Sequence, residues 1–517
     1  MPRVVAGVWP TCALLLLTGT IAHAAPRTWT VAAGGDVQAA LNAAQPGDTI
    51  LLQAGVTFVG NFVLPVKTGS EHVTLRSGAP DSALPGTNVR MTPAYASLLP
   101  KLRSPNSMPV LSTAPGAHHY QLMQLEFLSN AQGLGDMLAL GDGSAAQSSL
   151  TMVPHDLIVD RVYMHGDPVV GQKRAIALNS AATTISNSHI ANIKAVGQDS
   201  QAIAGWNGPG PYLISNNFLE AASENVCFGG TDPSILNLVP SDITFTRNHL
   251  SKQLVWRTEG KWNVKNLFEL KTGRRVLIDG NLMENNWLEA QAGYAILFTP
   301  RNQEGAAPWT VIEQVQFTNN HVRHVSAGFN ILGHDYTHPS RETNSIVIRN
   351  NLFEDVSRAT FGGSGMFVLV NGGQNITIDH NTVMQDGTSA IYGDTNPSLG
   401  FVLTNNIVRD NSWAIMGGNT SPGNGTIAYY FPGSQILKGI YVGSNPATYP
   451  PNNFYPATLD QVGFVDWRTG NYRLLPSSPY RGAATDGTDV GVNIDALSAA
   501  FGTLKSPQNV TIRPSAH

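Results

Sequence analysis

The feature that most constrains this chain is a short strand pattern that returns along its middle and ends each time in asparagine. The pattern is aliphatic, any residue, aliphatic, two polar residues and then Asn, as in "VLIDGN". Copies follow one another at intervals of 25 to 39 residues, a period typical of solenoids. The copies end at Asn217, Asn248, Asn281, Asn320, Asn351, Asn381 and Asn406, and a weaker one ends at Ser188.

The strands within each repeat are short, alternate apolar and polar residues, and are separated by Gly, Asn and Pro. Such a unit cannot bury its apolar face alone, but a stack of units forms a continuous core. We identify two strands in each unit, and stacking predicts that each runs parallel to its counterparts above and below. The repeated asparagines are predicted to be structural, because an amide at the bend can hydrogen-bond the backbone of the adjacent coil.

The beginning of the chain predicts a cap for this stack. The segment "GGDVQAALNAAQPGDTILLQAG" places Val37 and Leu41 on one helical face, with Asp36 as the N-cap and Pro46 near the end. A solenoid leaves its first coil open, and an amphipathic helix can cover that end.

Together, "VQAALNAAQPGDTILLQAG" and the Asn-ended coils resemble the pectate-lyase-like right-handed parallel β-helix superfamily, over roughly residues 28–425. The resemblance implies an all-β fold, a right-handed parallel β-helix with an N-terminal amphipathic cap helix. It leaves the function open, because that superfamily holds lyases, hydrolases, esterases and non-catalytic adhesins.

The rest of the chain is divided by composition. Residues 1–24 read as a signal peptide, with Arg3, the apolar run "CALLLLTGTIA" and an A-x-A site ending at Ala24. We therefore expect a secreted or periplasmic protein, in which Cys227 is the one remaining cysteine and no intrachain disulfide forms. Residues 25–425 are expected to form the capped β-helix, 426–505 the C-terminal coils and cap, and 506–517 a polar tail.

Charge gives a local rather than a global signal. The net charge of −4 and pI near 6.4 give no reason to expect nucleic acid as a partner, and we identify no transmembrane segment and expect a monomer. Between Lys252 and Arg275, however, the sequence contains seven basic residues and only two acidic ones. The excess favours an anionic partner, and a solvated loop with a weak Glu269–Lys271 surface pair is the alternative.

A second set of strands, after the Asn-ended ones, aligns polar residues into a stripe that suits a chain-like ligand. From this stripe and the basic run we take Glu269, Arg274, Arg275, Trp206, His334 and Asn371 as candidate substrate-binding residues. The stripe is predicted to run through Asp142, Asn179, Trp206, Asn207, Asp232, Lys271, Arg301, His334, Asp335, Asn371, Asp394 and Asn419.

Within it, "ELKTGRRVLIDGN" followed by "ILFTPRN" resembles the chondroitinase B and alginate lyase group of β-helix lyases. The resemblance implies Lys271 as the general base and Arg301, one coil on, as the residue that binds substrate or protonates the leaving oxygen. That group holds calcium with acidic residues on the strand before the lysine, where this chain has "NVKNLFE". The sequence therefore leaves the need for calcium as a cofactor open, with Glu224, Asp232 and Glu269 as candidate ligands.

Three functions follow as hypotheses. The first is a lyase that cleaves an anionic, uronic-acid-containing polysaccharide by β-elimination, which needs a base and a cation for the carboxylate. The second is a glycoside hydrolase that uses a pair of carboxyls from Asp335, Asp394 and Glu269. The third is a non-catalytic carbohydrate-binding or surface protein. Arginines near Lys271 would lower its pKa and Glu269 would raise it, so the sequence leaves the sign of the shift open.

Overall fold

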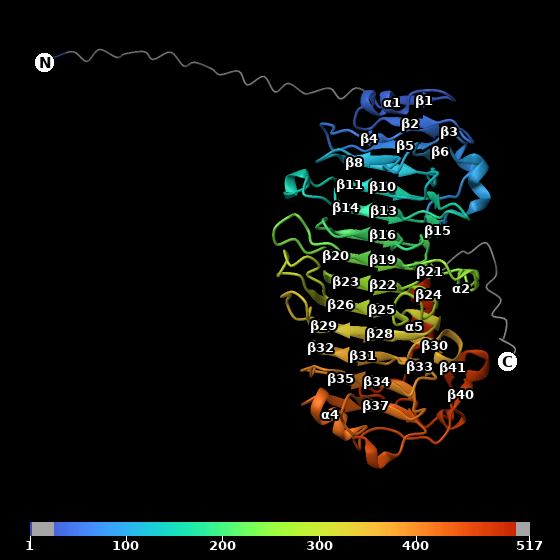
Figure 1. Cartoon of the computed structure of the whole chain (residues 1–517), viewed down its shortest axis with the longest axis vertical. Coiled ribbons are helices and arrows are strands. Elements are labelled where there is room, and N and C mark those ends of the chain that lie inside the picture. The colour runs from blue at the N-terminus through green and yellow to red at the C-terminus, as the bar shows by residue number, and fades with distance from the viewer. Residues whose placement is uncertain (3–24, 503–517) are drawn as a thin grey trace.

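Three long parallel sheets wind around one axis and form a right-handed parallel β-helix, as the sequence predicts (Figure 1). The computed structural model describes residues 1–2 and 25–502. The expected polar tail lies outside these residues, and so does the expected signal peptide apart from its first two residues. Within the described part of the chain, no helix combines the length and apolarity that a membrane crossing requires.

Each coil contains three strands, one from each sheet. In the coil around Asn281 they are β23 (Gly273–Asp279), β24 (Leu282–Asn286) and β25 (Tyr294–Phe298), after which β26 (Ile312–Thr318) pairs in parallel with β23. The sequence indicated two strands per repeat. The middle strand was missed because only Gly280 and Asn281 separate it from the strand before, so the two read as one apolar segment.

The sheets differ in length. The first has 14 strands, from β1 (Thr28–Val31) to β38 (Gln435–Leu437), and the second has 13, from β3 (Thr57–Val59) to β39 (Ile440–Val442). The third sheet has 12 strands and faces the viewer in Figure 1. Its strands are β4 (Phe62–Leu64), β7 (Leu111–Thr113), β10 (Asp136–Leu140), β13 (Arg174–Leu178), β16 (Gln201–Gly205), β19 (Glu224–Phe228), β22 (Asn266–Leu270), β25, β28 (Ala327–Leu332), β31 (Val368–Asn371), β34 (Ser389–Gly393) and β37 (Trp413–Gly417).

Inside the coils, alternate residues of every strand stack into a continuous apolar core. Phe317 and Phe329, from different sheets, meet edge to face with ring centroids 5.0 Å apart, and Phe353 and Phe367 meet in the same way at 4.9 Å. These aromatic contacts fill the interior between the three sheets and fix their spacing.

The asparagines form a buried ladder at the turn between the first and second sheets, which confirms their structural role. The Asn281 side chain accepts from the Asn248 backbone N–H at 2.8 Å and donates to the Phe245 carbonyl at 3.1 Å and to the next asparagine, Asn320, at 2.9 Å. The same contacts repeat up to Asn406, and Ser188 begins the series by donating its backbone N–H to Asn217. Each amide therefore satisfies two backbone groups of the preceding coil that would otherwise be buried without partners, and it also bonds to the asparagine side chain of the next coil.

Short helices lie at the ends of the stack (Figure 1). Helix α1 (Val37–Ala43) begins where the Asp36 side chain accepts from the Ala39 N–H, and its Val37 and Leu41 join the core of the first coils. Helix α4 (Asn424–Tyr430) lies beside β37 at the other end. Beyond it, β40 (Phe464–Asp466) and β41 (Asn471–Leu474) pair antiparallel.

The final described segment runs back along the outside of the coils. Asn493 donates its backbone N–H to Asn350, and Gly491 donates to the Asn405 carbonyl. Helix α5 (Ile494–Phe501) follows and places Ala500 next to Gly280. Two smaller helices, α2 (Val255–Glu259) and α3 (Arg358–Phe361), lie in loops between the second and third sheets.

We predict that Asn281→Leu destabilises the protein by about 2–4 kcal/mol, because the Asn248 N–H and the Phe245 carbonyl lose their buried partner. Chemical denaturation followed by circular dichroism measures the loss. Asn344→Ala, which removes exposed side-chain contacts from the first sheet, is the matched control. Equal midpoints for the two variants would show that the ladder does not stabilise the stack.

Candidate active site

The outer face of the third sheet carries a row of side chains whose character changes near the middle of the stack. Strand pairing aligns Ala204 with Cys227, Cys227 with Glu269, Glu269 with Leu297, and Leu297 with Asn330. Cys227 therefore lies on the outer face of the sheet beside Glu269 and not in the core. In this row Glu269 is the charged residue, and it is almost completely covered.

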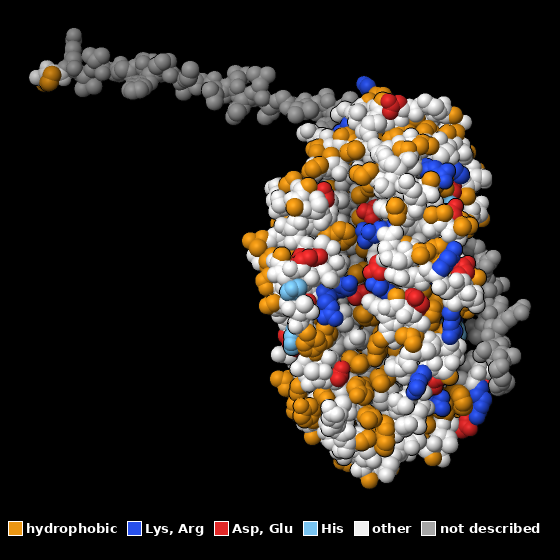
Figure 2. Space-filling view, viewed as in Figure 1, with side chains coloured by type: hydrophobic (Ala, Val, Ile, Leu, Met, Phe, Trp, Pro, Cys, Tyr) orange, Lys and Arg blue, Asp and Glu red, His pale blue; other side chains and the backbone are white. Residues whose placement is uncertain are grey.

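Lys271 and Arg301 lie on adjacent coils and line one cavity, as the sequence predicted for their placement. The Arg301 backbone N–H donates to the Lys271 carbonyl at 2.9 Å, which holds the two segments together. The cavity has a volume of about 280 Å³, and Glu269, Tyr294 and Asn330 also line it. Figure 2 shows basic and acidic side chains gathered in a hollow at mid-length on this face.

Lys271 is held against acidic groups. Its Nζ lies 3.9 Å from Oε1 of Glu269. Burial lowers the pKa of Lys271, but the negative charges of Glu269 and Glu224 outweigh burial and leave the pKa raised. Gly229, at φ +104°, passes so close that a Cβ there would lie 2.7 Å from the Lys271 Cβ, so only glycine allows this approach.

Arg301 is positioned by Asp335, which lies on the next coil. Its Nη1 lies 3.6 Å from Oδ1 of Asp335, whose other oxygen accepts from the Asn302 N–H at 3.0 Å. Asp232, a candidate calcium ligand, accepts instead from the backbone N–H groups of Gln303, Glu304 and Ala306. Asp232 therefore fixes the loop after Arg301, and it does not join Glu224 and Glu269.

A second lysine, at a position that the sequence did not indicate as part of the site, lies among the acids beside Lys271. The Lys265 ammonium forms ion pairs with Asp199 and with Glu224, the latter at 3.3 Å. Burial lowers the pKa of Lys265, and the charges of Glu224 and Asp199 reverse the effect and leave it raised. Gln201 donates to the other oxygen of Glu224 at 2.9 Å.

This arrangement does not fit a calcium ion. The Oδ1 atom of Asn266 is buried without a hydrogen-bond partner, an oxygen that a hard cation could use. However, Glu224 is already neutralised by Lys265, and the Asn266 amide nitrogen donates to Glu269 at 2.9 Å. Calcium needs six to eight converging oxygens, and among the described residues these carboxylates do not converge on one point. The Lys265 ammonium, rather than a metal ion, balances the charge of the acidic residues here.

Lys252 anchors the beginning of β22 from inside the fold. Its buried ammonium contacts five oxygens, among them the carbonyls of Ala221, Ser223 and Asn266 at 2.8–3.0 Å. Burial lowers the pKa of Lys252 to about 7, while Glu224 acts in the opposite direction. The contacts join β22 to the strand below, so Lys252 positions the site and is not available to a ligand.

Arg274 and Arg275, expected beside Lys271, lie on β23 in the first sheet. Arg275 pairs with Asp242 at 2.6 Å and Arg274 lies 3.7 Å from Glu313. The chain turns into the next sheet at Thr272 and Gly273, which carries the two arginines onto another face. The basic run of the sequence is therefore not one patch, and the expected effect of these arginines on the Lys271 pKa has no geometric basis.

Trp206 lines a second cavity, of about 210 Å³, that also reaches Lys271. Its ring lies 5.2 Å from the Arg174 guanidinium, and its indole N–H donates to the Gly143 carbonyl at 2.9 Å. Cys227 and Glu224 complete the wall. Burial raises the pKa of Cys227, which keeps it a thiol.

Beyond Arg301 the stripe continues as a connected polar network. Tyr336, half exposed, donates to Oδ1 of Asn371 at 2.6 Å and lies edge to face with His334, with ring centroids 5.1 Å apart. His334 pairs with Glu342 at 3.2 Å. Tyr336 was missed because an aromatic residue in a loop gives no periodic signal.

Part of the predicted stripe is internal turn structure rather than free surface. Asn179 accepts from the backbone N–H groups of Trp206 and Asn207, and the Asn207 amide donates to the Asp142 carbonyl. Both asparagines are buried. Aligning the repeats identified the correct edge of the sheet. It could not distinguish an asparagine that stabilises a turn from one that is exposed.

Comparison with known proteins shows the fold. No family model matches the chain, and no curated protein does either. Among solved structures, the family 6 polysaccharide lyase AlyGC, an alginate lyase, aligns with a TM-score of 0.57 at 14% identity, over 95% of this chain and 59% of that one. This chain thus spans about three fifths of that lyase. The resemblance to the pectate-lyase-like β-helix superfamily is confirmed as a resemblance of fold.

Two further solved structures align less closely. An alginate lyase from Paenibacillus sp. str. FPU-7 has a TM-score of 0.36 at 17% identity, over 76% of this chain and 98% of that one. The catalytic unit of a GH87 α-1,3-glucanase from Streptomyces thermodiastaticus strain HF3-3 has 0.46 at 13% identity, over 83% and 69%.

We predict that Lys252→Met lowers the stability by about 3–5 kcal/mol, because it leaves carbonyl oxygens from two coils buried without a donor. Thermal unfolding followed by circular dichroism measures it. Lys261→Met, at an exposed lysine that lies over the Trp262 ring, is the control. A melting temperature for Lys252→Met equal to that of the control would contradict the anchoring role.

Proposed function

We propose that the protein is an exported lyase that cleaves a uronic-acid-containing polysaccharide by β-elimination, at the cavity between Lys271 and Arg301. The observation that carries the proposal is that two cationic side chains from adjacent coils line one cavity on an elongated face. A uronate chain lying along the stack would pass one carboxylate between them. The fold shared with AlyGC supports a polysaccharide as the ligand class but does not specify the reaction.

In the proposed reaction, Arg301 binds the carboxylate and Lys271 transfers the proton. Arg301 binds the uronate carboxylate, because a guanidinium can engage both carboxylate oxygens. The Lys271 amine takes the proton from the carbon α to that carboxylate. The electrons of the broken C–H bond form the new double bond, the bond to the 4-linked oxygen breaks, and the leaving oxygen is protonated by the Lys271 ammonium.

The raised pKa of Lys271 sets a condition on this chemistry. At neutral pH the side chain is an ammonium, and only its small deprotonated fraction can act as a base. Activity should therefore rise as the pH rises toward the Lys271 pKa. Glu269 tunes the reaction, because its negative charge holds the proton on Lys271.

A hydrolase would need two carboxyls across the scissile bond. Of the described residues that line the cavity of Lys271 and Arg301, Glu269 is the only carboxylate. Asp335 is buried and accepts from Asn302 and Thr337 as well as contacting Arg301. The geometry therefore favours the lyase over the hydrolase, and a non-catalytic binding protein is the remaining alternative.

The first test uses polymers of mannuronate, guluronate, glucuronate and galacturonate. We expect unsaturated product ends, detected by ultraviolet absorbance, from at least one polymer. Lys271→Ala and Arg301→Ala should each lower kcat/KM by at least about a hundredfold, as expected for loss of a proton-transfer group or a charge clamp.

Arg275→Ala, on the first sheet, is the matched control and should retain the wild-type rate. New reducing ends without ultraviolet absorbance would indicate a hydrolase. Retention on the immobilised polymer without either product would indicate a binding protein.

The second test is the pH profile. Glu269→Gln removes the charge that raises the Lys271 pKa, so more amine is present at a given pH. We expect the rising limb of kcat/KM to move to lower pH in this variant. Glu313→Gln, on the first sheet, should leave the limb where it is, and an unmoved limb in Glu269→Gln would exclude Lys271 as the titrating base.

A further inference from the structure

We propose that the first sheet holds a divalent transition-metal ion, zinc by its donor set, between His119, His155 and Asp156. One ligand atom from each of these residues lies within 4.8 Å of the other two. Two imidazoles and one carboxylate are a donor set that suits zinc and similar transition metals rather than calcium or magnesium. The site is remote from Lys271, which follows a strand of the third sheet.

The fold supplies the position of the ligands. His118 on β8 (His118–Met123) pairs with His155 on β11 (His155–Asp160), and the next paired residues are Tyr120 and Leu157. His119 and Asp156 are thus the residues skipped by the pairing, with φ of +56° and +52°. The same left-handed position recurs in later coils as Ala182, Asp242 and Arg275, so the bulge belongs to the repeat. Here the sequence fills it with two metal-binding side chains.

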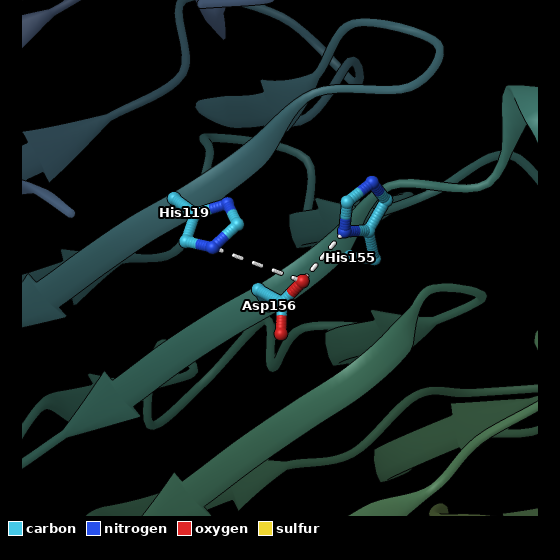
Figure 3. A group of neighbouring side chains, drawn as sticks. All are labelled: His119, His155 and Asp156. Atoms are coloured by element: carbon cyan, nitrogen blue, oxygen red, sulfur yellow. Dashed lines mark hydrogen bonds and ion pairs between the residues drawn. The ribbon is translucent and has the colours of Figure 1, made fainter. Parts of the chain in front are cut away.

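Figure 3 shows the rings of His119 and His155 on either side of the Asp156 carboxylate. His155 Nδ1 lies 2.7 Å from Oδ2 of Asp156, and His119 Nε2 lies 4.0 Å from the same oxygen. Donor atoms around a tetrahedral zinc ion are about 3.3–3.5 Å apart, which follows from bonds of about 2.0–2.1 Å. Small rotations of the two rings bring the three donors to this spacing.

A second observation fixes how His119 would bind. Its Nδ1 is 2.7 Å from Nδ1 of His118, so the two rings share a hydrogen bond. The other nitrogen, Nε2, is the one that faces Asp156. Histidines that bind metal are commonly oriented by a hydrogen bond at the second ring nitrogen.

The surrounding residues extend the cluster across three coils. His118 stacks on His155 with ring centroids 4.9 Å apart, and His72, on the preceding coil, lies 5.3 Å from His119. The three residues are only partly buried, so an ion can reach the site from solvent. A metal ion there would bridge β8 and β11 and stabilise the N-terminal part of the stack, with no part in chemistry at the third sheet.

The test is metal binding by the full chain, freed of metal with a chelator and of any polyhistidine tag. After equilibration with Zn²⁺ and gel filtration, we expect about one zinc per chain by elemental analysis. The melting temperature should rise with zinc concentration. Co²⁺ should give the visible absorption of a site with histidine ligands.

His155→Ala and the milder His119→Gln should each weaken zinc binding by at least about tenfold. The control is His324→Ala, on another sheet. His324 Nδ1 lies 2.8 Å from Oδ2 of Asp355, and the two side chains are 41% and 40% exposed. For comparison, His155 and Asp156 are 43% and 44% exposed. No retained zinc in the wild type, or equal loss in His324→Ala and His155→Ala, would overturn the proposal. The readouts do not depend on polysaccharide cleavage, so this result and that of the proposed function are separable.

Discussion

The stacking of each coil on the next determines where the side chains of this protein lie. Parallel backbone pairing alone would allow the coils to slip, but the buried asparagines tie each turn to the coils on both sides at fixed positions. A one-residue slip would break these hydrogen bonds and expose the apolar set that faces the interior. The register that results carries every side chain of the outer faces to a defined place.

That register makes a site from residues that are far apart in the sequence. Glu269 lies between Cys227 and Leu297, and Arg301 meets Lys271 through a backbone hydrogen bond, only because the strands pair as they do. The lysines near this site differ in their burial and in their partners. Lys252 is internal and structural, Lys265 neutralises Glu224, and Lys271 faces the cavity. Three lysines in one short stretch thus have three different roles.

Features of the structure that repeat along the sequence could be predicted, whereas corners and irregular loops could not. The ladder from Asn217 to Asn406 could be predicted because its spacing and its apolar flanks repeat. The placement of Lys271 and Arg301 on adjacent coils could be predicted because both follow an apolar strand. Arg274 and Arg275 were misplaced, since two residues of turn carry the chain to another sheet and no local pattern marks a corner. The pairing of Lys265 with Asp199 could not be predicted, because it depends on a loop that has no period.

A crystal structure of the Lys271→Ala variant with a bound oligouronate, which this variant should not cleave, tests the proposed site at Lys271 and Arg301 most sharply. We expect the sugar chain to lie along the third sheet with one carboxylate at the Arg301 guanidinium, above Glu269. Density for the oligosaccharide along the first sheet, at Arg274 and Arg275, would contradict it.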